Sequence, residues 1–174
     1  MKTRTFSVLV GATACVATLS GAQVPQEETK DKLLRVAHTL IGQPPAALTT
    51  EKLTEAIIGL LDVVAATTPD NQYRKDIQYR IDVAKDLIKR DSLFNDKARQ
   101  YLSFAYRQMT SGVKFEAPKE LQEFVTPTEF QEKSLKYLKG LVDKAQTSLA
   151  VGKTADTAKT VLEMVLMIMT PVSG

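Results

Sequence analysis

The sequence predicts an all-α fold of about six helices, paired as three helical hairpins in one compact bundle behind an N-terminal signal peptide. Apolar residues recur at spacings of three and four along most of the chain, and no window alternates apolar and polar residues as a half-buried strand would. Glycine, proline and Ser/Thr cap signals separate these periodic stretches. Residues 23–174 suit one domain that is large enough to enclose its own core.

Residues 1–22 have the three parts of an export signal. Lys2 and Arg4 supply positive charge, residues 6–19 are apolar, and small residues precede a cleavage position after Ala22. The apolar part is too short for a membrane-spanning helix, which needs about 20 such residues. We therefore expect an exported chain, periplasmic or secreted, with no transmembrane segment after cleavage.

A second interpretation of the same segment stays open. A lipoprotein signal would end at Ala14 and acylate Cys15, which would give the mature chain a lipid anchor in the envelope. Ala12 stands where that motif prefers leucine. Cys15 is a functional site only under this second interpretation.

Cleavage after Ala22 changes the charge and the chemistry of the chain. The whole sequence has a formal net charge of +3, and the leader holds two basic and no acidic residues, so the mature chain has a charge of +1. Such a weak positive field argues against a nucleic-acid partner. Cys15 is the only cysteine, so the mature chain has neither a disulfide nor a cysteine-ligated metal.

Two helices are expected before residue 68. The first ends at Gly42, ahead of a proline pair, and the second starts after a cap at Thr49 and runs to about Thr67. Their apolar stripes are Leu33, Leu34, Ala37, Leu40 and Ile41 in the first helix and Leu53, Ile57, Leu60 and Val64 in the second.

A third and a fourth helix form the expected middle hairpin. Thr68 should cap the third helix, because Pro69 suits the first helical position and Asp70 places an acid in the first turn. Ser92 can cap the fourth helix. The stripes are Tyr73, Ile77, Ile81, Ala84 and Ile88, then Ala98, Tyr101 or Leu102, Ala105 and Met109; Asp76–Arg80 and Asp86–Arg90 are surface ion pairs.

The longest connection covers residues 110–126, with one short turn expected around Leu121 and Phe124. A capping box at residues 126–129 then opens the fifth helix, which Gly152 ends. Its apolar stripe is Leu135, Leu138, Val142, Ala145 and Leu149.

Thr154 can cap the sixth helix, which runs to about Met169. Residues 161–169 leave this helix almost no polar face, so it must be covered on all sides. The pattern predicts a central core helix; the alternative is a surface left for a partner or a second subunit.

His38 is the only histidine and therefore the only imidazole available for catalysis or ligation. A haem held by His38 and one of the methionines at 109, 164, 167 or 169 is a second hypothesis, of the kind that helical bundles allow. The spacing favours a structural or surface histidine instead. No residue set points to a catalytic site, a metal site or a cofactor.

Four residues of the middle hairpin form a candidate contact surface. By helical spacing Tyr79 shares a face with Arg90, and Tyr106 shares one with Arg99, which allows both tyrosines to be exposed. The alternative is that the two rings lie flat along the bundle with only their hydroxyls in water. Exposed tyrosines beside arginines are typical of surfaces that bind proteins, peptides or glycans.

These observations predict an exported, non-enzymatic helical domain that mediates protein or envelope interactions, including self-association. A bundle that binds haem or a small apolar ligand is the first alternative. A hydrolytic enzyme that uses carboxylates is the second, because two-carboxylate catalysis leaves no local sequence signature.

Overall fold

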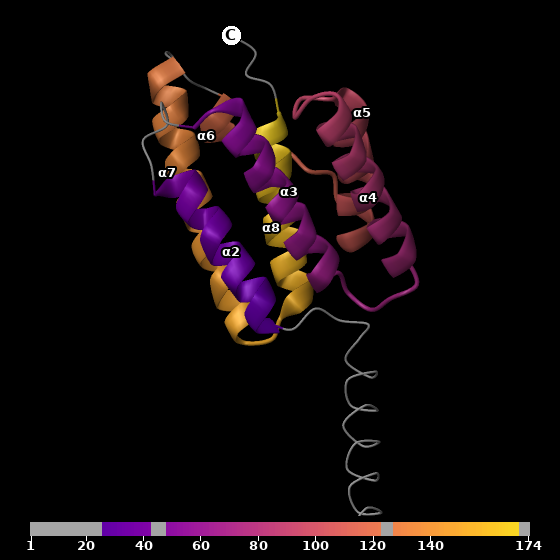
Figure 1. The fold of residues 1–174 in the computed structure, drawn as a ribbon. Helices are drawn as coiled ribbons and strands as arrows, with labels where there is room; N and C mark the ends of the chain where they lie inside the picture. Colours follow the sequence, from indigo (N-terminus) through magenta and orange to yellow (C-terminus); the bar gives the residue numbers. More distant parts are fainter. Residues whose placement is uncertain (1–25, 43–47, 123–126, 171–174) are drawn as a thin grey trace, which may run out of the picture.

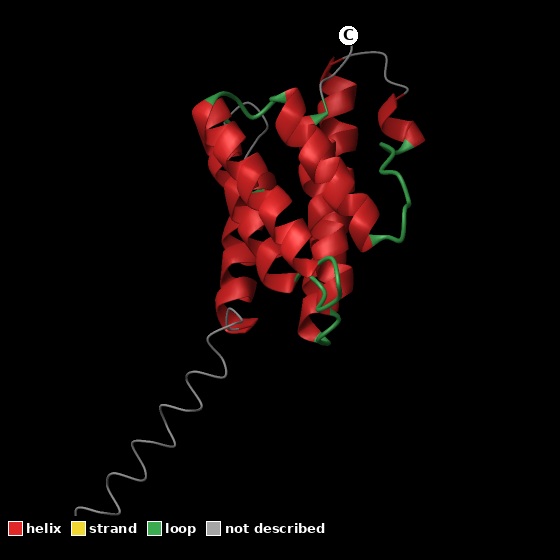
Figure 2. Ribbon diagram, turned by 90° about the vertical axis from the view of Figure 1, so that its right-hand side faces the viewer, coloured by secondary structure: helices red, strands yellow, loops and turns green. Residues whose placement is uncertain are grey.

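The computed structural model describes residues 26–42, 48–122 and 127–170, and these residues form helices joined by turns and loops, with no strand among them (Figures 1 and 2). Six long helices and one short helix account for this part of the chain. The helices are α2 (Gln26–Ile41), α3 (Thr50–Thr67), α4 (Arg74–Arg90), α5 (Asp96–Met109), α6 (Lys119–Gln122), α7 (Pro127–Ala150) and α8 (Thr154–Met169).

The six long helices pair as the predicted three hairpins. In space α2, α3, α8 and α7 contact one another in that order around a shared core, and α7 closes the group against α2. The α4–α5 hairpin lies on the other side of α3 from α2, where α4 packs on α3 and α5 packs on α8 (Figure 1). The fold is therefore a four-helix bundle with a third hairpin added to one side.

The prediction that the last helix lies at the centre is confirmed. Ten of the 16 residues of α8 are buried, and the helix contacts α3, α5 and α7. Its nearly continuous apolar sequence is thus explained by neighbours on several sides, since a helix without a polar face is stable only when covered.

Two helix ends follow the sequence signals closely. The Thr49 hydroxyl accepts a hydrogen bond of 3.2 Å from the Lys52 N–H and so caps α3. At the end of α7, Gly152 has a φ of 77°, its N–H donates to the Leu149 carbonyl, and the Lys153 N–H donates to the Ser148 carbonyl at 2.9 Å. These two bonds make a Schellman motif, which turns the chain directly into α8.

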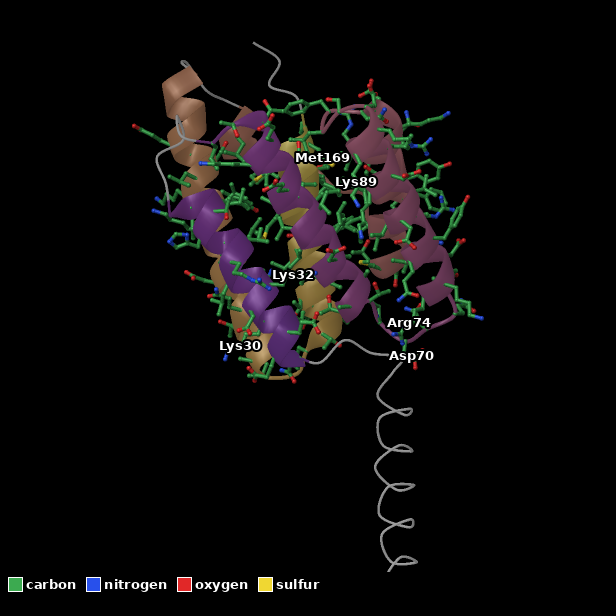
Figure 3. The ribbon with its side chains drawn as sticks, in the orientation of Figure 1. Lys30, Lys32, Asp70, Arg74, Lys89 and Met169 are labelled. Carbon is green, nitrogen blue, oxygen red and sulfur yellow. The ribbon has the colours of Figure 1, made fainter. Side chains whose placement is uncertain are left out.

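The predicted start of α4 is wrong. Thr68 does not cap this helix, because its hydroxyl donates to the Val64 carbonyl at the end of α3. The Asn71 side chain accepts a hydrogen bond from the Tyr73 N–H and holds the chain in a turn, so α4 begins only at Arg74. Asp70 lies beside Arg74 at this turn, with 3.5 Å between the charged groups (Figure 3).

Two further cap predictions are wrong for a similar reason. The Ser92 hydroxyl accepts a hydrogen bond from the Phe94 N–H inside the α4–α5 turn, and Asn95 caps α5 by accepting one from the Ala98 N–H at 2.9 Å. Thr154 is the first helical residue of α8, and Lys153 holds the cap position without a side-chain bond. A short polar side chain near a turn can form a hydrogen bond with any of several backbone groups. Which of these bonds forms depends on the path of the turn in the folded protein.

The long connection contains the short turn that was expected, and Leu121 of α6 is buried. Phe124 lies outside the described residues, as does Thr126, the cap residue of the capping box predicted at residues 126–129; α7 begins at Pro127. Ahead of α6, residues 114–116 lie over a small cavity of about 260 Å³ that Tyr106, Tyr137 and Glu163 also line.

One ion-pair network joins three helices. Asp62 of α3 lies 3.1 Å from the Lys32 ammonium of α2 and also accepts a hydrogen bond from Lys85 of α4. Partial burial raises the pKa of the Asp62 carboxyl, but the two lysines outweigh that effect and hold the pKa below its ordinary value. Lys32 projects from the middle of α2 toward α3 (Figure 3).

The predicted signal at residues 1–22 and the alternative lipid site at Cys15 lie outside the described residues. Among the described helices, none combines the length and the apolar content that crossing a bilayer requires.

Candidate functional site

The candidate site is a groove between the start of α4 and the end of α5, referred to below as the α4–α5 groove. The two helices are antiparallel neighbours, so Tyr73, Asp76 and Arg80 face Phe104, Arg107 and Gln108 across it. The groove has a volume of about 980 Å³ and is open to solvent. This volume lies near the top of the range of about 300–1,000 Å³ for small-molecule sites, and the open shape suits an extended segment better than an enclosed ligand.

An arginine stacked on a phenylalanine forms one wall of the groove. The Arg80 guanidinium carbon lies 4.1 Å from the centre of the Phe104 ring, which is within cation–π range. The Phe104 ring remains 46% exposed, and the Tyr73 side chain in the same groove is 44% exposed. Two half-exposed rings and a mostly buried guanidinium group thus line the same groove.

Asp76 holds the polar floor of the groove in position. Its Oδ2 atom accepts a hydrogen bond of 2.9 Å from the Gln108 side-chain amide and lies 3.6 Å from Arg80 Nη2. The carboxylate thereby ties α4 to α5 and orients Arg80 over Phe104. The predicted Asp76–Arg80 ion pair is confirmed, with a partner on α5 that the sequence did not indicate.

Both side chains that contact Asp76 also contain a buried polar atom without a partner in the described part of the chain. These atoms are Arg80 Nε, a donor, and Gln108 Oε1, an acceptor. Buried polar atoms nearly always have partners, because leaving one unpaired costs about 1–3 kcal/mol. Arg80 and Gln108 thus each retain one unused hydrogen-bonding atom beside the groove.

The charge of the groove is weakly positive. Arg80 and Arg107 line it together with the single carboxylate of Asp76. Arg107 is exposed and has no ion-pair partner within residues 26–42, 48–122 and 127–170. An approaching carboxylate would therefore meet an uncompensated guanidinium.

Of the four residues predicted to form a contact surface, Tyr106 is not exposed. Its side chain is only 5% exposed, its hydroxyl donates a hydrogen bond of 2.9 Å to Glu163 Oε1 on α8, and Phe115 packs edge-on against its ring. Burial and the Glu163 carboxylate both raise the pKa of Tyr106 far above its ordinary value. The expectation of exposure was wrong because the buried face of α5 is wider than the predicted apolar stripe. The adjacent residues Ala105 and Tyr106 are both buried.

The other three residues remain at the surface but do not form one patch with Tyr106. Tyr79 is 62% exposed, and Arg90 is exposed and paired with Asp86, as predicted. Arg99 is one-third exposed and pairs with Asp96 at 2.9 Å. None of the three lines the α4–α5 groove.

His38 is exposed on α2, whereas the sulfur-bearing side chains of Met164 and Met169 are enclosed in the core. Met167 is likewise buried, and Met109 of α5 is partly buried. Within the described residues, no three carboxylate, imidazole or thiol side chains lie together as a metal site would require.

The sequence pattern missed the groove for identifiable reasons. Tyr73 fits the apolar stripe of the third helix by spacing, yet it precedes the first turn of α4 and is half exposed. Phe104 and Arg80 are 24 positions apart, so no local pattern joins them. The one sequence feature that could have indicated the groove is Phe104, because this large apolar residue does not belong to the apolar stripe of its own helix.

Comparisons of this chain with protein-family models, with curated proteins and with solved structures give no match.

Proposed function

We propose that the protein is an exported, non-enzymatic helical domain that binds a protein partner through the α4–α5 groove. The observation that carries this proposal is the pair of half-exposed rings, Tyr73 and Phe104, with Arg80 stacked on one of them. Tyrosine and arginine are enriched among the residues that dominate binding energy at protein interfaces, and aromatic rings bury large areas at low cost in conformational entropy.

The chemistry of the groove also suggests what the partner presents. The groove combines apolar rings with guanidinium groups, one of them without an ion-pair partner among the described residues. A segment with a carboxylate next to an aromatic or aliphatic side chain complements both features. The unused donor on Arg80 and acceptor on Gln108 could bind the backbone of such a segment after small side-chain rotations.

Site-specific photocrosslinking in cells tests the binding surface. A photoreactive phenylalanine at position 104 or 73 should give a discrete adduct with one protein. The matched control is position 94, because Phe94 is 50% exposed at the other end of the same hairpin. Arg80→Ala should abolish the adduct at 104. Equal adducts at 94 and 104, or no adduct at either groove position, would contradict the proposal.

The location of the protein has a separate test. N-terminal sequencing of the protein recovered from the cell envelope should begin at Gln23, the residue after the proposed cleavage position. A chain that begins at a blocked, lipid-modified Cys15 would support the anchored form. A chain that retains Met1 to Ala22 in the cytoplasmic fraction would refute export.

A further inference from the structure

A second groove lies on the opposite part of the bundle, between α6 and α7. It has a volume of about 750 Å³ and is lined by Leu121 of α6 together with residues of α7. Three lysines and a glycine follow α7 at offsets of three, four and four, so they share one face of the helix. They are Lys133, Lys136, Gly140 and Lys144. We refer to this feature as the lysine groove.

The floor of the lysine groove is apolar. Leu121 and Leu141 are buried and contribute hydrocarbon surface, and the Tyr137 ring beside them is 37% exposed. Lysine side chains extend a charged group beyond a four-carbon stem, so their ammonium groups can stand at the edge while the stems cover the floor. The result is an apolar strip between positive charges.

The charge of this groove is not balanced by acidic residues of its own lining. No carboxylate lines it among the described residues, and neither Lys136 nor Lys144 has an ion-pair partner in that part of the chain. Lys32 and Lys85 differ from these exposed lysines, since both bind Asp62. An anionic group is therefore the natural counterpart of the lysine groove.

Gly140 is the feature that points to a ligand. It lies in the interior of the 24-residue helix α7, where glycine is less favourable than any other residue except proline. Its φ is not positive, and a Cβ atom built at this position has no described atom within 4 Å. Neither a turn nor close packing against the described residues requires glycine here, but its missing side chain keeps the middle of the groove open.

We propose that the lysine groove binds a single-chain amphiphile with a carboxylate head, as in a long-chain fatty acid. The carboxylate lies over Gly140, between the ammonium groups of Lys136 and Lys144. The hydrocarbon chain lies along Leu121, Leu141 and the Tyr137 ring. The groove falls within the volume range of small-molecule sites, and its mixture of a largely apolar lining and a few charged groups is typical of them.

Titration of the purified protein with a dansyl-labelled long-chain fatty acid tests the proposal. Saturable fluorescence enhancement at one ligand per chain is expected. Gly140→Leu should lower the affinity at least tenfold, because it fills the groove while improving the helix. Gly140→Ala is the matched control for the helix effect and should change the affinity less than threefold.

Lysine variants test the predicted ion pairs between the carboxylate and the groove. The double variant Lys136→Gln and Lys144→Gln should lower the affinity at least tenfold, whereas Lys97→Gln, an exposed lysine on α5, should leave it unchanged. Equally tight binding of the methyl ester, or full competition by acetate at the same concentration, would overturn the proposal. So would unchanged binding by Gly140→Leu or the absence of saturation.

Discussion

The Tyr106 hydroxyl on α5 lies 2.9 Å from Glu163 Oε1 on α8 and donates a hydrogen bond to it. This bond links the added α4–α5 hairpin to the central helix of the bundle. The Glu163 side chain is 17% exposed, and the Lys159 ammonium stands 4.0 Å from the same oxygen. Tyr106 therefore supplies the close hydrogen-bond donor that offsets the cost of enclosing most of the Glu163 carboxylate.

Removal of that donor should destabilise the protein. Tyr106→Phe keeps the ring and its contact with Phe115 but leaves Glu163 without its hydroxyl partner. We expect the free energy of unfolding to fall by about 2 kcal/mol, the usual range for a hydrogen bond to a charged group. Urea unfolding followed by circular dichroism measures this. Tyr101→Phe on the same helix is the control, and an equal loss in both variants would contradict the assigned bond.

The same tyrosine should make the protein sensitive to alkali. The folded pKa of Tyr106 lies above the ordinary value of 10.0, so the folded state keeps the phenol proton more tightly than the unfolded state does. The stabilisation is complete below pH 10 and is lost as the pH rises beyond it. The difference in absorbance at 295 nm between the protein and its Tyr106→Phe variant should therefore develop only as the protein unfolds above pH 10. A difference that develops in folded protein at pH 10 would refute this expectation.

Asp62 should contribute stability with the opposite pH dependence. Its folded pKa lies below the ordinary value of 3.8, so the ion pairs with Lys32 and Lys85 are fully formed above that pH and are lost as the pH falls through the folded pKa. Asp62→Asn should cost about 1 kcal/mol at pH 7, a modest value because solvent partly screens the pairs. The cost should shrink in urea titrations as the pH falls below 3.8. A cost that does not change with pH would argue for packing instead of charge.

Gly140→Ala should stabilise the protein. The position is helical, its φ is not positive, and the added methyl group meets no described atom within 4 Å. We expect a gain of about 0.5–1 kcal/mol in the free energy of unfolding, the difference between the two residues in a helix interior. A loss of stability would show that something packs tightly against this position.

Gly152→Ala should have the opposite sign. Gly152 occupies the left-handed position of the Schellman motif between α7 and α8, with a φ of 77°. A side chain is strained in that conformation, so we expect a loss of about 1–2 kcal/mol even though there is open space around the position. Thermal unfolding of the two glycine variants side by side measures the contrast. A stabilised Gly152→Ala protein would contradict the motif.

The helical fold could be predicted from the sequence because its information is local. The apolar stripe of α4 is buried as expected, and it consists of Ile77, Ile81, Ala84 and Ile88. Thr49 caps the start of α3 with its hydroxyl, and Gly152 ends α7 in a left-handed backbone conformation, as the sequence predicts. Helix six of the prediction is the central α8. Each of these predictions depends on residues within a few positions of one another.

The choice among several nearby caps could not be predicted. Thr68 and Asn71 both lie where α4 could start, and Ser92 and Asn95 compete at α5. All four side chains make a bond to the backbone. Which of them starts a helix depends on how the hairpins dock, because docking fixes the path of the intervening turn.

The amino-acid order specified which segments are helical and which face of each is apolar, because those properties depend on spacings of three and four along one chain. The partners of the polar and aromatic side chains were settled by the packing of the hairpins. Tyr106 has the spacing of a surface residue in a narrow stripe, yet docking on α8 encloses it against Glu163, 57 positions away. Arg80 meets Phe104 for the same reason: contacts between distant positions exist only after helices have packed, and no local pattern encodes them.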